Sequence, residues 1–423
     1  MTPTIIVLLS GLATLLVGVG LLGTLLGVRA SVEAFSSIET GMIMAGYYVG
    51  YILGTLFVPR ILRNVGHIRT FAALAAVIAA VSLGFGMLVH PLSWLVLRIL
   101  NGLAVVGVYM VVESWISEQS AGPSRGRVFS IYMMSTLVAL GGGQFLLLVG
   151  DVSGLLPFAL ATILITLGVI PIAITRINEP QIQPAAAFGL RALFRVSPLG
   201  AVGAFAAGVV NGAFWGMTAV FGHAIELDKL QIALLMSTTI LGGALLQWPI
   251  GHLSDRHDRR KVLIGVSLAT GGLAAAVAYI VLRDLPGLIV SAGIYGGLMF
   301  SLYGLCVAHT NDHLPQGQVL EATRGMLLTY GIGALTGPLL GGVAMQLVGP
   351  VGLPAVSSGT AIALALYGLY RMTRRLPPPI EDQSEYVPMV RTSPIALELY
   401  PEAEAADDAT DGPGEPDNDK VPR

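Results

Sequence analysis

The sequence has little cysteine and little charge. Cys306 is the one cysteine in 423 residues, so an intramolecular disulfide is impossible, and a small buried thiol is its expected role. Charged residues make up only 11% of the chain, and the basic ones stand mostly in short connectors between apolar stretches. No basic surface is therefore left over for a nucleic acid.

Several catalytic and nucleotide-binding patterns are missing as well. The chain has no Walker-type phosphate loop, which argues against ATP-driven pumping. It also has no His-Glu-x-x-His motif, no Gly-x-Ser-x-Gly motif and no paired aspartates within an apolar stretch, so we expect no enzyme, no cofactor and no metal centre. His309, Asp312 and His313 stand close together at the end of one apolar stretch, which leaves a metal site there as an alternative to ordinary helix-end polarity.

Hydrophobic residues are the most abundant class in the sequence. They make up 54% of the chain, the mean hydropathy is +0.77, and they gather in twelve stretches long enough for a helix to cross a hydrocarbon core of about 30 Å. The period-two alternation typical of a membrane β-barrel is absent. The sequence therefore predicts an all-α membrane protein with spans at residues 3–28, 40–58, 70–89, 93–112, 128–150, 154–175, 199–222, 231–250, 262–282, 287–309, 325–347 and 350–371.

The basic residues predict the orientation of these spans, because cytoplasmic connectors retain lysine and arginine. One set of alternate connectors holds thirteen: Arg60, Arg63, Arg69, Arg125, Arg127, Arg176, Arg191, Arg195, Arg256, Arg259, Arg260, Lys261 and Arg324. The opposite set holds three: Arg29, Lys229 and Arg283. We expect a multi-pass protein of the cytoplasmic membrane with both termini in the cytoplasm. The first stretch lacks a basic segment before it and a clear cleavage site after it, so it is predicted to be a retained helix.

The spans divide into two halves at the longest internal connector. Residues 192 positions apart match after the second and eighth spans: Gly50, Pro59 and Arg69 correspond to Gly242, Gly251 and Lys261. The expected regions are a first six-helix bundle (1–175), a cytoplasmic linker (176–198), a second six-helix bundle (199–371) and a tail (372–423). Residues 381–423 carry 12 acidic and 3 basic side chains with little apolar surface, so the tail is predicted to be disordered.

The connector after the eighth span carries a recognisable signature, Gly251-His-Leu-Ser-Asp255-Arg256-His-Asp258-Arg259-Arg260-Lys261. The glycine lets two helices approach closely, and the aspartate can lie at a helix N-terminus or pair with an arginine. This connector resembles the Gly-x-x-x-Asp-Arg-x-Gly-Arg-Arg signature of the major facilitator superfamily, although Asp258 replaces its second glycine. The first-half copy departs further, with Pro59 and Arg63 in place of the glycine and the aspartate.

The resemblance implies two pseudo-symmetric six-helix bundles with a substrate site between them at mid-membrane. It also implies that the signature connector favours one access state, with Asp255 and Arg256 as gating residues. The alternative is that the basic cluster merely enforces topology. Arg98, Asn101 and Gly102 in the fourth span resemble a pattern found in many proton-coupled members of the superfamily, so Arg98 is predicted to take part in coupling. A snorkelling arginine is the alternative.

A second set of motifs is similar to the YcaD-like branch of this superfamily. The set comprises Gly66-His67-Ile68-Arg69, Val111-Val112-Glu113-Ser114-Trp115, Arg125-Gly126-Arg127, Ile131-Tyr132-Met133-Met134 and Gly143-Gln144-Phe145-Leu146-Leu147. Members of this branch are regarded as transporters without an assigned substrate. Glu113 is expected to join Arg125 and Arg127 in a network that stiffens the first half, or alternatively to carry a proton.

Polar and aromatic side chains within the spans are candidates for a substrate cavity: Gln144, Asn211, Trp215, Gln247, Tyr295 and Tyr303. Ordinary hydrogen bonds between packed helices are the alternative for each of them. Glycines recur every fourth residue in the seventh and eleventh spans, at 208, 212 and 216 and at 333, 337 and 341, which predicts helix faces that allow close packing.

These observations predict a secondary active transporter that moves a small solute by alternating access and is coupled to protons. A facilitative carrier without coupling and a non-transporting membrane sensor remain the alternatives. The expected partners are a small-molecule substrate, membrane lipid and protons, with no nucleic acid, and the expected oligomeric state is a monomer.

Overall fold

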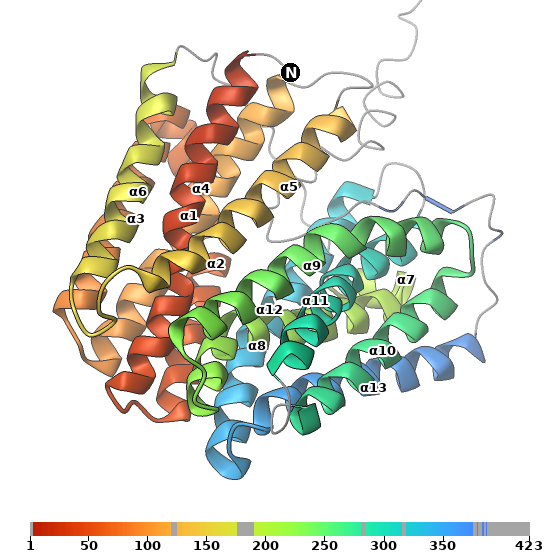
Figure 1. Ribbon diagram of the computed structural model, residues 1–423. Coiled ribbons are helices and arrows are strands. Elements are labelled where there is room, and N and C mark those ends of the chain that lie inside the picture. The colour runs from red at the N-terminus through yellow and green to blue at the C-terminus, as the bar shows by residue number, and fades with distance from the viewer. Residues whose placement is uncertain are drawn as a thin grey trace, which may run out of the picture.

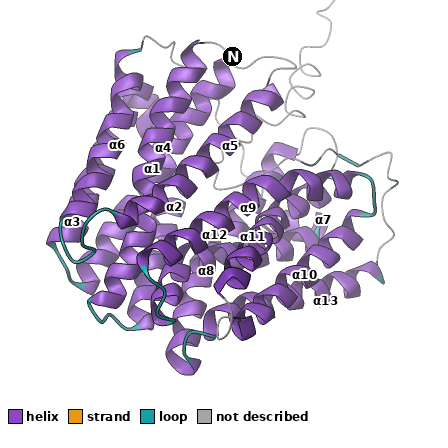
Figure 2. Ribbon diagram, in the orientation of Figure 1, coloured by secondary structure: helices purple, strands orange, loops and turns teal. Residues whose placement is uncertain are grey.

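The computed structural model describes residues 3–119, 125–175, 190–280, 285–314 and 319–374, together with residues 379, 383, 384 and 386. The regular secondary structure of these residues is entirely helical (Figure 2). Twelve of the described helices are long and apolar enough to cross a membrane. The predicted number of spans and the all-α fold class are therefore confirmed.

The helices follow the chain in an order that Figure 1 labels. Their bounds are α1 Pro3–Val32, α2 Ser37–Val65, α3 His67–Met87, α4 Pro91–Gln119, α5 Arg125–Gly143, η2 Gln144–Leu148, α6 Leu156–Ile174, α7 Leu190–Val196, α8 Pro198–Ala224, α9 Lys229–Asp255, α10 Arg259–Ile280, α11 Leu285–Asn311, α12 Val319–Val348 and α13 Gly352–Met372.

Local signals explain where two of these helices begin. Ser36 and Glu39 form a reciprocal capping box at the start of α2, and Asp228 and Gln231 form another at the start of α9. These two helices are the second and eighth spans, whose sequences match at an offset of 192, and they share the same local start signal.

Three features differ from the spans read off the sequence. Helix α4 runs on to Gln119 rather than ending near residue 112, because backbone hydrogen bonding continues past the apolar run. The fifth span changes from α-helix to a 3₁₀ helix at Gln144. The short helix α7, Leu190–Val196, lies within the region expected to be a linker.

Close helix crossings recur in both halves. A Cβ atom added to Gly102 of α4 would lie 1.9 Å from the backbone oxygen of Tyr47 in α2. A Cβ atom added to Gly296 of α11 would likewise lie 1.9 Å from the backbone oxygen of Thr239 in α9. The second and fourth spans of each half therefore cross at glycine contacts that no other residue fits without backbone movement.

The predicted glycine faces of the seventh and eleventh spans pack against each other. A Cβ atom on Gly212 of α8 would lie 2.1 Å from the backbone oxygen of Ala334 in α12. One on Gly333 of α12 would lie 2.1 Å from the backbone oxygen of Phe205 in α8. The prediction that these stripes permit close packing is confirmed, and the packing lies within the second half.

The two halves touch mainly near one end of their helices. Ser237 Oγ of α9 donates to the backbone oxygen of Gly141 in α5 at 2.6 Å, and Lys229 Nζ donates to that of Gly150 at 2.9 Å. These residues lie at the helix ends opposite the N-terminus, and the ribbons of the two halves diverge toward the side where the N-terminus lies (Figure 1).

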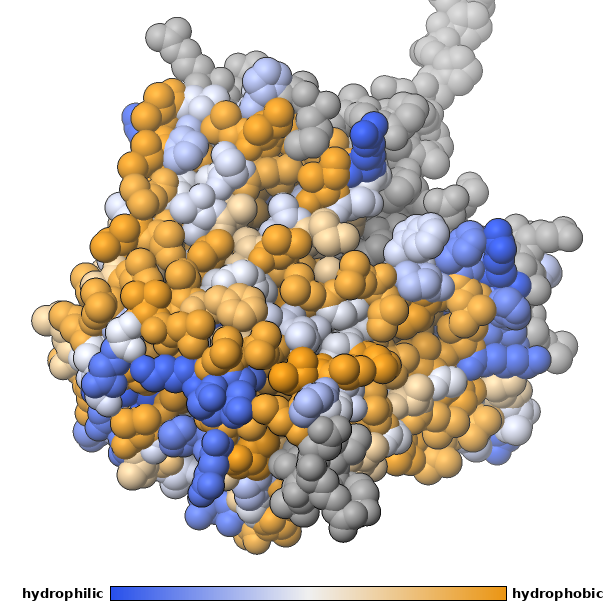
Figure 3. Space-filling model, in the orientation of Figure 1, coloured by the Kyte–Doolittle hydropathy of each residue, from blue (hydrophilic) through white to orange (hydrophobic). Residues whose placement is uncertain are grey.

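The outer surface is suited to lipid. Hydrophobic side chains cover most of the face shown in Figure 3. Peripheral helices contribute strongly to this surface, for example Ile174 of α6 and Leu366 of α13, which are 77% and 59% exposed. A multi-pass membrane protein is the consequence, because such a surface is stable only in an apolar solvent.

Part of the predicted tail is packed rather than loose. After α13 ends at Met372, Ser384 and Tyr386 contact the bundle formed by α9 and α11, and Tyr386 is only 9% exposed. These contacts differ from the disorder expected for residues 372–423. The rest of that region, apart from 372–374, 379 and 383, lies outside the described residues.

Candidate functional site

A small internal pocket lies where the two halves meet. Six elements contribute to its wall: α1, α2, α4 and η2 from the first half, and α8 and α9 from the second. The lining residues are Val19, Gly20, Gly23, Thr24, Tyr47, Arg98, Asn101, Gln144, Trp215 and Met236. The free volume is about 20 Å³, room for about one water molecule, so a larger solute enters only if these side chains move apart.

Arg98 supplies the only full positive charge in this lining. Its side chain is buried, with Nη1 donating to Asn101 Oδ1 at 3.3 Å and Cζ lying 5.0 Å from the centre of the Tyr47 ring. The guanidinium is thus turned into the protein and does not snorkel to the membrane surface. A cation–aromatic contact contributes up to about 2 kcal/mol when desolvated, which offsets part of the cost of placing a charge at this depth.

Gln144 lies beside Arg98 and holds helices together. Its Nε2 donates to the backbone oxygens of Gly20 at 3.1 Å and Leu140 at 2.8 Å, and its Oε1 accepts from the hydroxyl of Thr24. The amide therefore joins α1 to the junction of α5 and η2. Because Gln144 sits at that junction, it can both shape the pocket and fix the change of helix type.

Trp215 brings the second half to the same pocket. It extends from α8, and its ring centroid lies 5.1 Å from that of Phe214 and 6.0 Å from that of Phe300 in α11. This aromatic cluster supports the indole at the boundary between the halves. Trp215 and Gln144 are thus the two predicted cavity residues that the structure brings together with Arg98.

Two other predicted cavity residues pack within the second half. Asn211 Nδ2 donates to the backbone oxygens of Ala207 at 2.9 Å and of Met299 at 3.4 Å, which joins α8 to α11. Tyr303 of α11 packs on Tyr330 of α12 with ring centroids 4.7 Å apart. For these two side chains the structure favours helix packing over direct contact with the pocket around Arg98.

Gln247 is likewise buried away from that pocket. It lies in α9, and its Oε1 accepts no hydrogen bond from the described residues. Gln247 does not contribute to the lining around Arg98.

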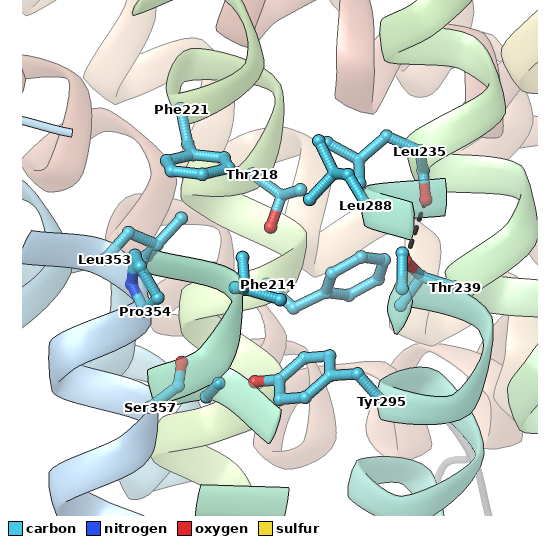
Figure 4. A pocket seen from close by; sticks show the side chains of 13 residues that line it. Phe214, Thr218, Phe221, Leu235, Thr239, Leu288, Tyr295, Leu353, Pro354 and Ser357 are labelled. Atoms are coloured by element: carbon cyan, nitrogen blue, oxygen red, sulfur yellow. Dashed lines mark hydrogen bonds between the residues drawn. The ribbon is translucent and has the colours of Figure 1, made fainter. Parts of the chain in front are cut away.

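Tyr295 lines a second pocket, inside the second half (Figure 4). Most of this pocket is apolar, with Phe214 and Leu288 among its walls, while the Tyr295 hydroxyl points toward Ser357. Thr239 also faces it, but its hydroxyl donates to the backbone oxygen of Leu235 at 2.7 Å. The second pocket thus offers few polar groups to orient a solute.

Three motifs of the first half meet at one end of its bundle. Glu113 is fully buried and accepts from the Tyr132 hydroxyl at 2.6 Å, which joins α4 to α5. His67 Nε2 and Ser114 Oγ lie 2.8 Å apart, which joins α3 to α4. Arg127 is exposed. The sequence predicted a network around Glu113, and Tyr132 is one of its partners; the side chain of Arg125 lies outside the described residues.

The signature connector forms ion pairs between α9, α10 and α11. Arg259 is 1% exposed, with Nη2 lying 3.0 Å from Asp255 Oδ1 and Nε 3.5 Å from Asp312 Oδ2. Asp258 binds Arg260 through both carboxylate oxygens, at 3.1 and 2.9 Å. Burial raises the pKa of Asp258, but the hydrogen bonds and charge of Arg260 outweigh it, so this pKa lies below its usual value.

The remaining predicted residues of this connector take no direct part in the ion pairs. Arg256 caps the end of α9 and is exposed. The described residues contain no group of three His, Cys, Asp or Glu side chains placed to hold a metal ion. One member of the His309, Asp312 and His313 cluster, Asp312, forms an ion pair with Arg259.

Tyr47 and Asn101 contribute to the pocket although neither was assigned a role from the sequence. Tyr47 belongs to a group of tyrosines with Tyr48 and Tyr51, and this aromatic density within one apolar span was a usable signal. Asn101 stood in the Arg98 motif without a role of its own; its Nδ2 has no hydrogen-bond partner among the described residues. Asn101 is therefore available to a guest in the pocket.

Comparison with known proteins agrees with this architecture. The model of the major facilitator superfamily matches residues 200–400. The nucleoside transporter NupG superposes with a TM-score of 0.73 and 16% identity over 88% of this chain and 100% of that one. The human organic anion transporter MFSD10 superposes with a TM-score of 0.56 and 14% identity over 87% of this chain and 100% of that one. Residues 200–400 are thus similar to the major facilitator superfamily, and the described residues share the fold of these two transporters. The twelve apolar helices make the chain a multi-pass membrane protein.

The chain is also similar to proteins called uncharacterized MFS-type transporter YcaD. The protein of that description from Escherichia fergusonii is 29% identical over 352 residues, which are 82% of this chain and 90% of the relative. The one from Salmonella enteritidis is 28% identical over 350 residues, with the same shares covered. The resemblance to the YcaD-like branch is confirmed.

Proposed function

We propose that this protein is a secondary transporter that carries a small solute with an acidic group through the pocket around Arg98. The observation that carries the proposal is the position of Arg98, a buried cation in the wall between the two halves. No aspartate or glutamate belongs to that lining, so the pocket presents a net positive charge. A carboxylate or similar anion is the guest that a guanidinium fork binds best.

Alternating access is the mechanism that the arrangement of the halves supports. The halves share a small pocket and touch mainly at one end of their helices. A rocking motion that opened those contacts and closed the opposite ends would expose the pocket to the other side. Asp255 and Arg256 lie at the end of α9. A movement that closed this side would change the groups around them, which supports a gating role.

The same charge balance supports proton coupling. Bringing an anion to Arg98 neutralises the pocket, and a proton carried with it compensates the charge that crosses the membrane. Uncoupled facilitation remains the second candidate. Expected further properties are a monomer surrounded by lipid in the cytoplasmic membrane.

Counterflow in proteoliposomes tests the proposed function. A thermal-shift screen of purified protein first finds acidic solutes that raise the melting temperature, because a ligand of the folded state stabilises it by mass action. Vesicles preloaded with such a solute should then accumulate its labelled form. If neutral analogues bind and exchange equally well, the assignment to acidic solutes is wrong, and if no binder exchanges, the protein is not a carrier of them.

Both termini are expected on the cytoplasmic side, and cysteine labelling checks this. In a Cys306→Ser background, single cysteines at Ser124 and Ser254 should resist an impermeant thiol reagent in intact cells, while one at Asp284 should react. The basis is the excess of basic residues in the connectors at 124 and 254. The reverse labelling pattern would invert the orientation.

A further inference from the structure

The end of the second half where α9 finishes holds a piece of the chain's own tail. Ser384 and Tyr386, here called the tail anchor, follow α13 and lie against the ends of α9 and α11. The Tyr386 ring belongs to a buried cluster that includes Leu302, Tyr303 and Cys306 of α11. An aromatic side chain from the tail therefore completes a hydrophobic core built by membrane-spanning helices.

Two glycines provide the space for this ring. A Cβ atom on Gly251 of α9 would lie 2.1 Å from Cδ1 of Tyr386, and one on Gly304 of α11 would lie 2.7 Å from its Cε2. Both distances are far below a normal carbon contact, so any larger residue at either place displaces the ring. Gly251 is the first residue of the signature connector, and seating Tyr386 gives that glycine a specific role in this chain.

Charged residues of the same connector hold the tail backbone. The Tyr386 amide donates to Asp255 Oδ1 at 3.0 Å, and Arg259 Nη2 donates to the Ser384 carbonyl at 2.5 Å. The amide and hydroxyl of Ser384 donate to Asp312 Oδ1 at 3.0 and 2.9 Å. Because Arg259 lies between Asp255 and Asp312, the tail anchor closes a network of alternating charges and backbone groups across α9, α10 and α11.

The Asp312 side chain is fully buried, so these contacts are strong ones. Burial raises the pKa of Asp312 above its usual value, while the Arg259 charge and the Ser384 hydrogen bonds oppose that shift. Removing the tail would therefore take away donors from a carboxylate that water reaches poorly. The site around Asp312 is therefore more stable when the tail occupies it than when the tail is absent.

We propose that the ends of α9 and α11 form a docking site for the tail anchor, and that the docked anchor restrains movement between the two halves. The restraint follows from the position of Asp255. Helix α9 runs beside α5, as the bond between Ser237 and Gly141 shows, and α5 begins with Arg125 on the side where α9 ends. If the two halves close on that side, Asp255 moves toward the positive N-terminal end of α5. The Asp255 carboxylate, however, already accepts a hydrogen bond from the Tyr386 amide.

Reactivity of the native cysteine tests the docking. Cys306 is fully buried in the cluster that Tyr386 completes, and it is the one thiol in the chain. In the purified full-length protein, Tyr386→Ala should raise the rate of Cys306 alkylation by a small uncharged maleimide at least about tenfold. Tyr386→Phe keeps the ring and should react like the parent protein. Tyr400→Ala, the same substitution elsewhere in the tail, should also leave the rate unchanged.

A substitution in the docking site, rather than in the tail, should have the same effect on Cys306 reactivity. Gly251→Ala adds a methyl group where the ring lies and favours the helix intrinsically, so α9 itself should not suffer. It should raise Cys306 reactivity as Tyr386→Ala does, and the double variant should exceed neither single variant, because both remove one contact. Parental rates in both single variants, or an equal rise in Tyr400→Ala, would overturn the docking.

Hydrogen exchange of the parent protein gives a test that needs no variant. The amides of Ser384 and Tyr386 both donate to carboxylates, so each should exchange at least about tenfold more slowly than its intrinsic rate. Exchange of both at the intrinsic rate contradicts the docking, even if every variant fails to fold.

The restraint itself rests on the proposed transport function and has its own readout. With a solute that exchanges in proteoliposomes, Tyr386→Ala should raise turnover at least about threefold without changing the half-saturating concentration, since the pocket around Arg98 is untouched. Unchanged turnover together with raised Cys306 reactivity would leave the docking site standing and refute its control of movement. Failure of all exchange in the parent protein would count against the proposed function, and not against the docking.

Discussion

Replacing Arg98 by alanine is expected to abolish accumulation of an acidic solute against its gradient. The variant loses the only full positive charge of the pocket lining, and a hydrogen bond to a charged group contributes about 1.5–3 kcal/mol. The apparent affinity should therefore fall roughly 10- to 100-fold. Exchange down a gradient at high solute concentration should survive in part, because the rest of the pocket is intact. Initial rates of uptake with and without an imposed pH gradient measure both effects.

Arg98→Lys and an arginine elsewhere serve as controls. Lysine keeps the charge but loses the planar fork, so it should restore only part of the affinity. Arg63→Ala removes an exposed arginine of the same half and should transport normally. If Arg98→Ala accumulates the solute as the parent protein does, Arg98 is a structural residue, and both the acidic-solute assignment and the coupling must be sought elsewhere.

Replacing Gly212 by leucine is expected to prevent the second half from folding. Even the first carbon of the new side chain would lie 2.1 Å from the Ala334 backbone oxygen, and α8 and α12 would have to separate. Overpacking costs about 1–3 kcal/mol where side chains can shift, and a backbone neighbour cannot shift without moving its helix. The yield of monodisperse protein in detergent and its melting temperature measure the loss.

Gly272→Leu is the matched control for this change. Gly272 lies in α10, is exposed, and a Cβ atom there meets no atom within 4 Å. The substitution is chemically the same and should leave the yield close to that of the parent protein. Equal yields of the Gly212 and Gly272 variants would show that the crossing of α8 and α12 tolerates a wider separation than the structure has.

The sequence determined the architecture because the membrane acts on each helix separately. An apolar run long enough to cross the hydrocarbon core must form a helix there, whatever its neighbours do. The twelve spans could therefore be predicted from local patterns. Glycines at every fourth residue also predicted close packing, and α8 and α12 do cross at Gly212 and Gly333.

Only the tertiary structure decided which polar side chains meet. With 3.6 residues per turn, a small rotation of a helix changes the neighbour that a given residue faces, and span boundaries do not fix that rotation. Gln144 and Trp215 therefore join Arg98 in one pocket, whereas Tyr295 lines another. Hydropathy gives no information on this division.

The tail also shows that local sequence does not determine which tertiary contacts form. Composition predicted disorder for residues 372–423, because acidic and proline-rich sequence buries little apolar surface. Composition is an average, however, and a single tyrosine suffices when a site for it exists. That site consists of Gly251, Gly304 and two aspartates from connectors far apart in the chain, and folding alone brings them within reach of Tyr386.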